Sequence, residues 1–332
     1  MDLQRFVLAA VAFLAGGTAL AAQTDSCVRR TIPVNLRTEK GQIVTGLATE
    51  NFRAELHRKA VRIVSVTAVS GTPRVAVLID KSGSMGATKG LWQANVAVAR
   101  DLVKALPVGS QVSISTFSDK TAKLVPFTDD RPHLQEVLEN VQADMPHGRT
   151  ALWDALAEVA ASQFADPRPG DSVYLISDGH DSDSKKSTRD VRRAFAAARI
   201  RLFAFSIAEA LSSNMIPEGW SEKDLPDLVE AAGGTEVMLR RNPMGMGPDA
   251  RSFPVLADKS GNPTEAGRAL LHQFPLIFSY DAVVVELPEA IPKDQPLELK
   301  LQGLTERNLI LSYPHILAAC DTNVAASSIP KN

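Results

Sequence analysis

The sequence predicts a doubly wound α/β domain with β-rich segments on both sides of it. Between residues 72 and 240, short apolar runs alternate with stretches of helical periodicity, which is typical of a mainly parallel sheet covered by helices. The two most apolar runs lead into Asp80 and Asp178, which places two carboxylates at one edge of the sheet. The flanks, residues 28–70 and 276–317, contain strand-like segments without helices between them.

Each element of the central block has its own signal. The expected strands are 74–80, 111–118, 122–128, 172–176, 202–207 and 236–239. Apolar spacing predicts helices around 96–106, 134–141, 152–159, 188–198 and 225–232, and a further one over Pro263–Phe274. Asp119-Lys120 is the expected hairpin turn, Asp130 the expected helix cap, and Gly233-Gly234 the expected helix end. Residues 241–262, rich in Gly and Pro, are expected to form a loop.

The flanks are expected to build one smaller β module. Strand-like segments lie at 32–37, 53–57 and 61–69 before the central block, and at 276–287, 297–301 and 308–313 after it. We expect Leu276–Leu287 and Ile32–Arg37 to share a sheet. This gives an N-terminal β segment over 22–71, a central domain over 72–275, and a C-terminal β segment over 276–332 that packs with the first.

Composition excludes several classes of protein. With 36 basic and 38 acidic side chains and a net charge of -2, the chain lacks the basic excess of a nucleic-acid binder. Its two cysteines are too few for a disulfide-rich scaffold, or for a zinc or iron–sulfur site that needs four cysteine ligands.

Residues 1–22 have the features of a secretory signal peptide. Arg5 precedes an apolar run from Phe6 to Ala15, and Ala19-Leu20-Ala21 fits a cleavage site after Ala21. The run is shorter than the about 20 residues that span a bilayer. The alternatives are an uncleaved anchor or, less favoured, a lipoprotein. No later stretch approaches 18 apolar residues. The mature chain is therefore expected to be periplasmic or extracellular and not to span a membrane.

Export bears on the two cysteines, which lie near opposite ends of the chain. In an oxidising compartment, Cys27 and Cys320 are expected to form a disulfide that joins the two β flanks. The alternative is a pair of free thiols near frayed termini.

Three loops collect oxygen donors at the expected ligand-binding edge of the sheet. Asp80, Ser82 and Ser84 form a D-x-S-x-S pattern after a strand, Thr150 precedes a helix, and Asp178 follows a strand. Hard oxygen donors select Mg²⁺, Mn²⁺ or Ca²⁺ over zinc or copper. Taken singly, these residues could instead be helix caps. Taken together and in this order, they predict a metal site.

The same residues resemble the metal-ion-dependent adhesion site of von Willebrand factor type A (VWA) domains, which have a Rossmann-like sheet. The segment IPVNLRTEKGQIVTGLATENFRAEL is also similar to an exported bacterial group of VWA-related proteins. The resemblance implies that Ser82 and Ser84 coordinate Mg²⁺ directly, Thr150 directly or through water, and Asp80 and Asp178 largely through water. It also implies that the ion accepts a carboxylate from a protein partner, in an adhesion or scaffold role without catalysis.

Two other functions remain open at this stage. One is a structural subunit that binds partners through its β flanks. The other is a Mg²⁺-dependent phosphohydrolase, although Ser82 stands where one major phosphatase class needs a second aspartate, and there is no G-x-x-x-x-G-K-[ST] loop. The run His180–Ser184 is expected to be a solvated loop, with a second cation site as the alternative. His147 is expected to be a surface loop residue, with ligand contact as the alternative.

Overall fold

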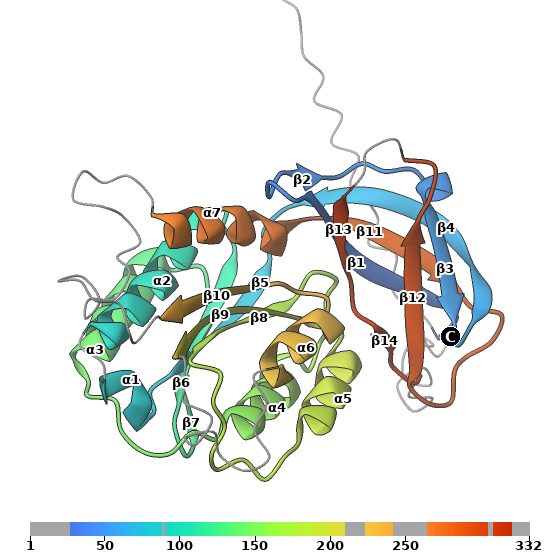
Figure 1. Ribbon diagram of the computed structural model, residues 1–332. Helices are drawn as coiled ribbons and strands as arrows, with labels where there is room; N and C mark the ends of the chain where they lie inside the picture. The colour runs from blue at the N-terminus through green and yellow to red at the C-terminus, as the bar shows by residue number, and fades with distance from the viewer. Residues whose placement is uncertain (1–26, 88–89, 210–222, 242–263, 305–307, 321–332) are drawn as a thin grey trace, which may run out of the picture.

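The computed structural model describes residues 27–87, 90–209, 223–241, 264–304 and 308–320. Two sheets lie next to each other, and the helices accompany the left-hand sheet in Figure 1. The helices are α1 (Gly83–Ala87), α2 (Leu91–Ala105), α3 (Arg131–Ala143), α4 (Leu152–Gln163), α5 (Thr188–Ala198), α6 (Asp224–Ala231) and α7 (Glu265–Phe278), with a 3₁₀ turn at Thr49–Asn51.

The six-stranded sheet confirms the predicted doubly wound α/β fold. Its strands are β5 (Arg74–Asp80), β6 (Gln111–Phe117), β7 (Thr121–Thr128), β8 (Ser172–Ser177), β9 (Arg201–Glu209) and β10 (Glu236–Arg241). They lie in the order β10-β9-β8-β5-β6-β7, and only the β6–β7 hairpin is antiparallel. One core packs the sheet against α2, α3 and α7, and a second core packs its other face against α4, α5 and α6.

The second sheet combines strands from both flanks of the chain. These strands are β1 (Arg29–Thr38), β2 (Ile43–Val44), β3 (Phe52–Leu56), β4 (Lys59–Ser70), β11 (Ser279–Glu286), β12 (Gln295–Leu301), β13 (Leu309–Ser312) and β14 (Ile316–Leu317). The order is β13-β1-β11-β4-β3-β12-β14, with β2 beside β1. The pairing of β1 with β11 confirms that the two predicted segments share a sheet; it runs from Arg29 opposite Glu286 to Val34 opposite Asp281.

A disulfide joins the two flanks of the chain, as predicted. Cys27 lies just before β1 and Cys320 just after β14, with their Cα atoms 5.4 Å apart. The predicted signal peptide, residues 1–21, lies outside the described residues, as does the expected loop over 241–262 except for Arg241, which ends β10. Within the described ranges, no helix combines the length and the apolar character needed to cross a bilayer.

A buried arginine connects the two sheets. Arg201, at the start of β9, is 0% exposed, and its guanidinium donates to Asn35 Oδ1 of β1 at 2.8 Å. It also donates to the carbonyls of Leu276 and Ile277 in α7, at 3.1 and 2.7 Å, and to that of Gly170 at 3.3 Å. Burial lowers the pKa of Arg201 to about 10, so the side chain is still charged at neutral pH.

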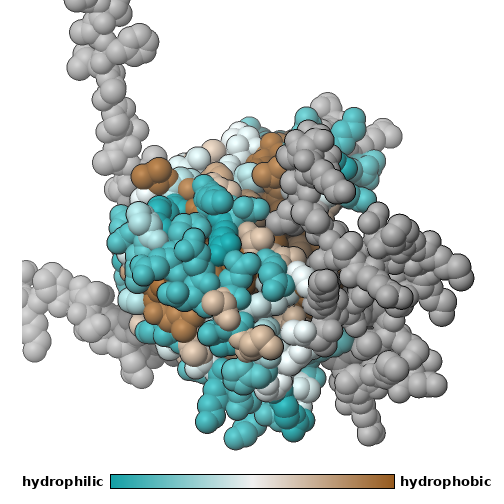
Figure 2. Space-filling view, turned by 90° about the vertical axis from the view of Figure 1, so that its left-hand side faces the viewer, coloured by the Kyte–Doolittle hydropathy of each residue, from teal (hydrophilic) through white to brown (hydrophobic). Residues whose placement is uncertain are grey.

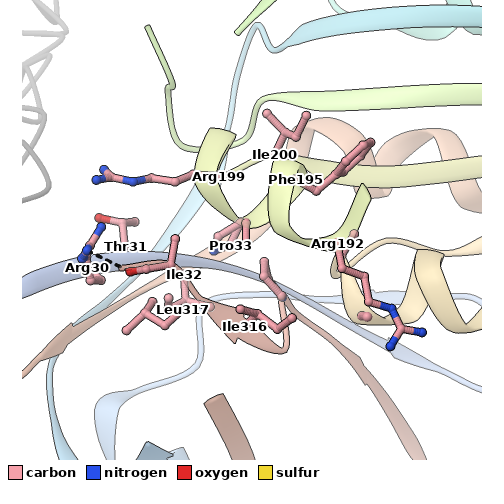
Figure 3. Close-up of a pocket in the computed structure, with 15 residues that line it drawn as sticks. Arg30, Thr31, Ile32, Pro33, Arg192, Phe195, Arg199, Ile200, Ile316 and Leu317 are labelled. Atoms are coloured by element: carbon pink, nitrogen blue, oxygen red, sulfur yellow. Dashed lines mark hydrogen bonds between the residues drawn. The ribbon is translucent and has the colours of Figure 1, made fainter. Parts of the chain in front are cut away.

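Apolar side chains complete the contact between the sheets. Figure 3 shows Ile32 and Leu317 of the flank sheet near Phe195 and Ile200 of the α/β half, around a cavity of about 50 Å³. A cavity of this size is far below the roughly 300–1,000 Å³ of ligand pockets. We therefore interpret it as a packing defect in the contact between the two sheets.

The boundary between α7 and β11 differs from the sequence prediction. The helix was expected over Pro263–Phe274 and the strand over Leu276–Leu287, but α7 runs from Glu265 to Phe278 and β11 begins at Ser279. Pro275 lies inside the helix. The helix continues past it because Leu276 and Ile277 are buried and their carbonyls accept hydrogen bonds from Arg201.

Candidate metal centre

Asp80 lies at the carboxyl end of β5, in the middle of the parallel sheet. Its side chain is 0% exposed, and its Oδ1 accepts a hydrogen bond from the backbone N–H of Ser82 at 2.9 Å. Its Oδ2 accepts a hydrogen bond from the hydroxyl of Ser177 at 2.7 Å. Ser177 ends β8, the parallel neighbour of β5. The carboxylate is therefore held in one orientation by both its own loop and the next strand.

The two serines of the D-x-S-x-S pattern lie close together. Their hydroxyl oxygens are 3.0 Å apart, with Ser82 buried and Ser84 exposed. Gly83 between them does not have a positive φ, and it begins α1. Its small size matters instead, because a Cβ there would lie 3.3 Å from the carbonyl oxygen of Gly148. Gly179 does have a positive φ, of 78°.

Backbone hydrogen bonds fasten the second loop to the other two. The N–H of Gly83 donates to the carbonyl of Gly148 at 3.0 Å. Thr150 is buried, and its N–H donates to the hydroxyl of Ser182 at 3.1 Å. Among the described residues, the Thr150 hydroxyl has no hydrogen bond to the other four candidate ligands. The structure thus brings the three loops together, with the Ser177 hydroxyl 2.7 Å from Asp80 Oδ2 and the Ser82 and Ser84 hydroxyls 3.0 Å apart.

The electrostatics of the site fit a bound cation. Burial, and then the charge of Asp178, raises the pKa of Asp80 to about 7. In the part of the chain that the structure describes, neither carboxylate has an ion pair, since the nearby Lys81 and Arg149 pair with Asp144 and Asp183. No group of three or more His, Cys, Asp or Glu side chains that could hold a metal occurs among the described residues. A metal at this edge would therefore need the hydroxyls as ligands.

The acidic run after Asp178 lies in a loop with Ser182 and Asp183 exposed, as expected, and two of its side chains also cap a helix. Asp181 Oδ1 accepts from the N–H of Leu152 at 2.9 Å, at the start of α4. The hydroxyl of Ser184 accepts from the N–H groups of Trp153 and Asp154 at 2.9 and 3.1 Å. Ala151, the residue at the N-cap of α4, has no polar side chain for this purpose. Asp181 and Ser184 therefore already bind N–H groups at the start of α4. We do not propose this run as a second cation site.

Removing the Asp181 side chain should destabilise the protein without changing its surface charge pattern elsewhere. Asp181→Ala removes the acceptor of the Leu152 N–H at the start of α4. We expect this to lower the free energy of unfolding by about 1–2 kcal/mol. Urea denaturation measures this. The matched control is Asp183→Ala, since Asp183 forms only a partly exposed ion pair with Arg149. Equal effects of the two substitutions would contradict the capping role.

Two features of the site were not identified from the sequence. Ser177 follows the expected strand over 172–176, but its hydrogen bond to Asp80 depends on strand pairing. Asp119 was read only as a turn residue, yet it follows β6 at the same edge of the sheet, and a Cβ on Gly148 would lie 3.3 Å from its Oδ1. Its position after a central strand was the available signal. His147 is exposed and its Nδ1 lies 2.9 Å from the carbonyl of Met145.

Figure 2 shows the molecule from the side toward which β9 and β10 point in Figure 1. Hydrophilic residues cover much of the visible surface on this side, with smaller hydrophobic patches between them. The carboxyl ends of β9 and β10 lie toward this side.

Comparisons with solved structures return VWA proteins at low similarity. A VWA protein from Catenulispora acidiphila is 15% identical, covers 92% of this chain and 78% of its own, and has a TM-score of 0.43. Protein BatB from Bacteroides thetaiotaomicron is 18% identical, covers 52% of this chain and 92% of its own, and has a TM-score of 0.41.

Sequence comparisons give one relative and one family. The chain is 26% identical over 200 residues to calcium-activated chloride channel regulator 1 of Bos taurus, which covers 58% of this chain. It spans only 20% of that protein's length. Residues 75–180, which include Asp80, Ser82, Ser84, Thr150 and Asp178, match the family model of the von Willebrand factor type A domain. Over residues 75–180, the α/β half of this protein is therefore similar to the von Willebrand factor type A domain family.

Proposed function

We propose that Asp80, Ser82, Ser84, Thr150 and Asp178 bind Mg²⁺, or Mn²⁺ or Ca²⁺ in its place, and that the ion attaches a carboxylate of a protein partner. The observation that carries this proposal is the pair of hydroxyls 3.0 Å apart beside a buried aspartate that has no basic partner among the described residues. Such a set attracts a hard cation.

The roles of the residues follow from their contacts. Asp80 holds the backbone of Ser82 and is itself oriented by Ser177, which keeps the two serine hydroxyls directed to one place. Ser84 is exposed, so the site opens to solvent on its side. When bound, the ion supplies a positive charge that attracts an anionic group. In this proposal Asp80 and Asp178 coordinate the ion largely through water, so few of its direct ligands are anionic and it can accept a carboxylate from a partner.

We further propose that the protein is exported and acts in adhesion or as a scaffold, without catalysis. The disulfide supports export, because disulfides persist in oxidising compartments. In this proposal residues 72–275 are the binding domain, and residues 22–71 and 276–332 form a β module around its ends. The partner that this chemistry requires is a protein with an accessible acidic side chain.

The metal site is tested by Mg²⁺ titration calorimetry with three variants. Ser84→Ala and Asp80→Asn should each weaken Mg²⁺ binding by about tenfold or more, since each removes an oxygen ligand or a charge. Asp183→Asn, which removes a carboxylate from the same edge, should leave the affinity unchanged. Unaltered binding in Ser84→Ala and Asp80→Asn would contradict the proposal.

The partner is tested by capture from exported proteins with Mg²⁺ or with EDTA. We expect capture by the wild-type protein in Mg²⁺ only, and none by Ser84→Ala. Capture that ignores both EDTA and the substitution would reject the metal-dependent role and favour binding through the β flanks. Turnover of a generic phosphoester that is lost in Ser84→Ala would instead favour the phosphohydrolase.

A further inference from the structure

A cleft of about 330 Å³ lies between the two sheets, at the amino end of β10. The turn between β1 and β2, the first residues of β10 and the last turns of α7 form its walls. The candidate metal residues lie at the opposite, carboxyl ends of the strands. The volume falls within the roughly 300–1,000 Å³ range of small-molecule sites, and the lining combines charged side chains with apolar ones such as Val237, Met238 and Leu276.

One wall of the cleft carries a cation without a partner. Arg37, on β1, is half-buried, and burial lowers the pKa of its guanidinium. Its Nε atom is buried and has no hydrogen-bond acceptor, and no carboxylate pairs with Arg37 among the described residues. An unpaired, partly buried guanidinium is costly, and a carboxylate is the group that matches its geometry.

The β10 wall of the cleft carries a carboxylate without a basic partner among the described residues. Glu236 begins β10, and one of its oxygens accepts a hydrogen bond from the hydroxyl of Ser206. Burial raises the pKa of Glu236, and within the described residues no lysine, arginine or histidine pairs with it. Beside it, the hydroxyl of Thr235 is buried without a hydrogen-bond partner. This wall therefore offers acceptors to a donor group such as an ammonium.

The remaining lining of the cleft is fixed in place. Gln273 of α7 donates to the carbonyls of Ala204 and Thr235 at 3.0 and 2.7 Å, and accepts from the hydroxyl of Tyr174 at 2.7 Å. Gly41 has a φ of 80°, and a Cβ there would lie 2.4 Å from Nδ1 of His272, so the turn rests directly on α7. These contacts hold the two charged walls at a set separation, which favours a ligand of defined size.

We propose that this cleft binds a small zwitterion of the α-amino acid type, with its carboxylate on Arg37 and its ammonium group on Glu236. The lining holds two cationic side chains, Arg37 and Lys40, and two acidic ones, Glu39 and Glu236. A purely anionic or purely cationic molecule would meet repulsion from one pair. A zwitterion satisfies both walls at once.

The probes are the common L-amino acids, each at about 10 mM, added to the full mature chain without Mg²⁺. Differential scanning fluorimetry identifies those that raise the melting temperature, and calorimetry then gives their affinity. We expect at least one to bind. The same molecule without its amine, and the same molecule without its carboxylate, should bind at least about tenfold more weakly.

The variants assign the site. Arg37→Gln and Glu236→Gln should each weaken amino-acid binding by about tenfold or more, with unchanged circular dichroism. Arg53→Gln, an exposed arginine on the same sheet, and Ser84→Ala, at the metal centre, should bind as the wild type does. Since Ser84→Ala removes only the proposed metal function, the two proposals can fail separately. No binding by any amino acid, or wild-type affinity in both cleft variants, would overturn this inference.

Discussion

Replacing Arg201 by leucine should lower the melting temperature by on the order of 10 °C. The substitution leaves the carbonyls of Gly170, Leu276 and Ile277 and the amide oxygen of Asn35 without the donor they share. It also removes a cation whose Cζ lies 5.1 and 4.7 Å from the ring centroids of Phe203 and Tyr280. Losing one member of such a buried charged network costs about 3–5 kcal/mol.

Two further variants show whether this loss belongs to the network. Arg201→Lys keeps the charge but cannot reach four acceptors with one ammonium, so we expect an intermediate melting temperature. Arg189→Leu, on the exposed face of α5, should change it by no more than about 2 °C. Differential scanning calorimetry measures all three. If Arg201→Leu had the same melting temperature as the wild type, the guanidinium would have no stabilising role between the two sheets.

Loss of the Cys27–Cys320 disulfide should be the second large effect. The bond joins residues that are 293 positions apart, and cross-links that close long loops restrict the unfolded chain most. We expect the Cys27→Ser/Cys320→Ser protein to lose about 2–5 kcal/mol in the free energy of unfolding. Chemical denaturation with and without a thiol reductant measures the change.

The reductant supplies the control for this prediction. It should lower the stability of the wild-type protein to that of the double serine variant, and it should not affect the variant. Hydrogen exchange should quicken first at the start of β1 and in β14, the two strands next to the cysteines. If the oxidised and reduced wild-type proteins had the same free energy of unfolding, the Cys27–Cys320 disulfide would not stabilise the protein.

Local patterns predicted much of the α/β fold. The bounds of β5 and α5 match the expected segments, because each is a self-contained apolar run or amphipathic stretch with its own end signals. Asp130 does cap α3, accepting from the N–H of His133 at 3.0 Å. Where the bounds or the cap of an element depend on residues nearby in the sequence, the sequence alone predicts them.

The misses share a different cause. Pro275 is a normal stop signal, but α7 continues past it because Asn35 and Arg201, both distant in sequence, bind carbonyls near its end. Asp181 and Ser184 cap a helix that begins about thirty positions earlier in the chain. Ser177 becomes a partner of Asp80 only when β5 and β8 pair. Periodicity carries no information about contacts of this kind.

The position of β11 sets the order in which the protein can fold. β11 lies between β1 and β4 in the sheet, although both of those strands come from the other end of the chain. Arg29 of β1 pairs with Glu286 of β11, and the two residues are 257 positions apart in the sequence. Because such long-range pairing is slow, we expect this sheet to form later than the α/β half, whose contacts are more local. Until residues 279–286 have been synthesised, β1 and β4 each present an unpaired edge. Completion of the sheet therefore depends on strands as late in the sequence as β14.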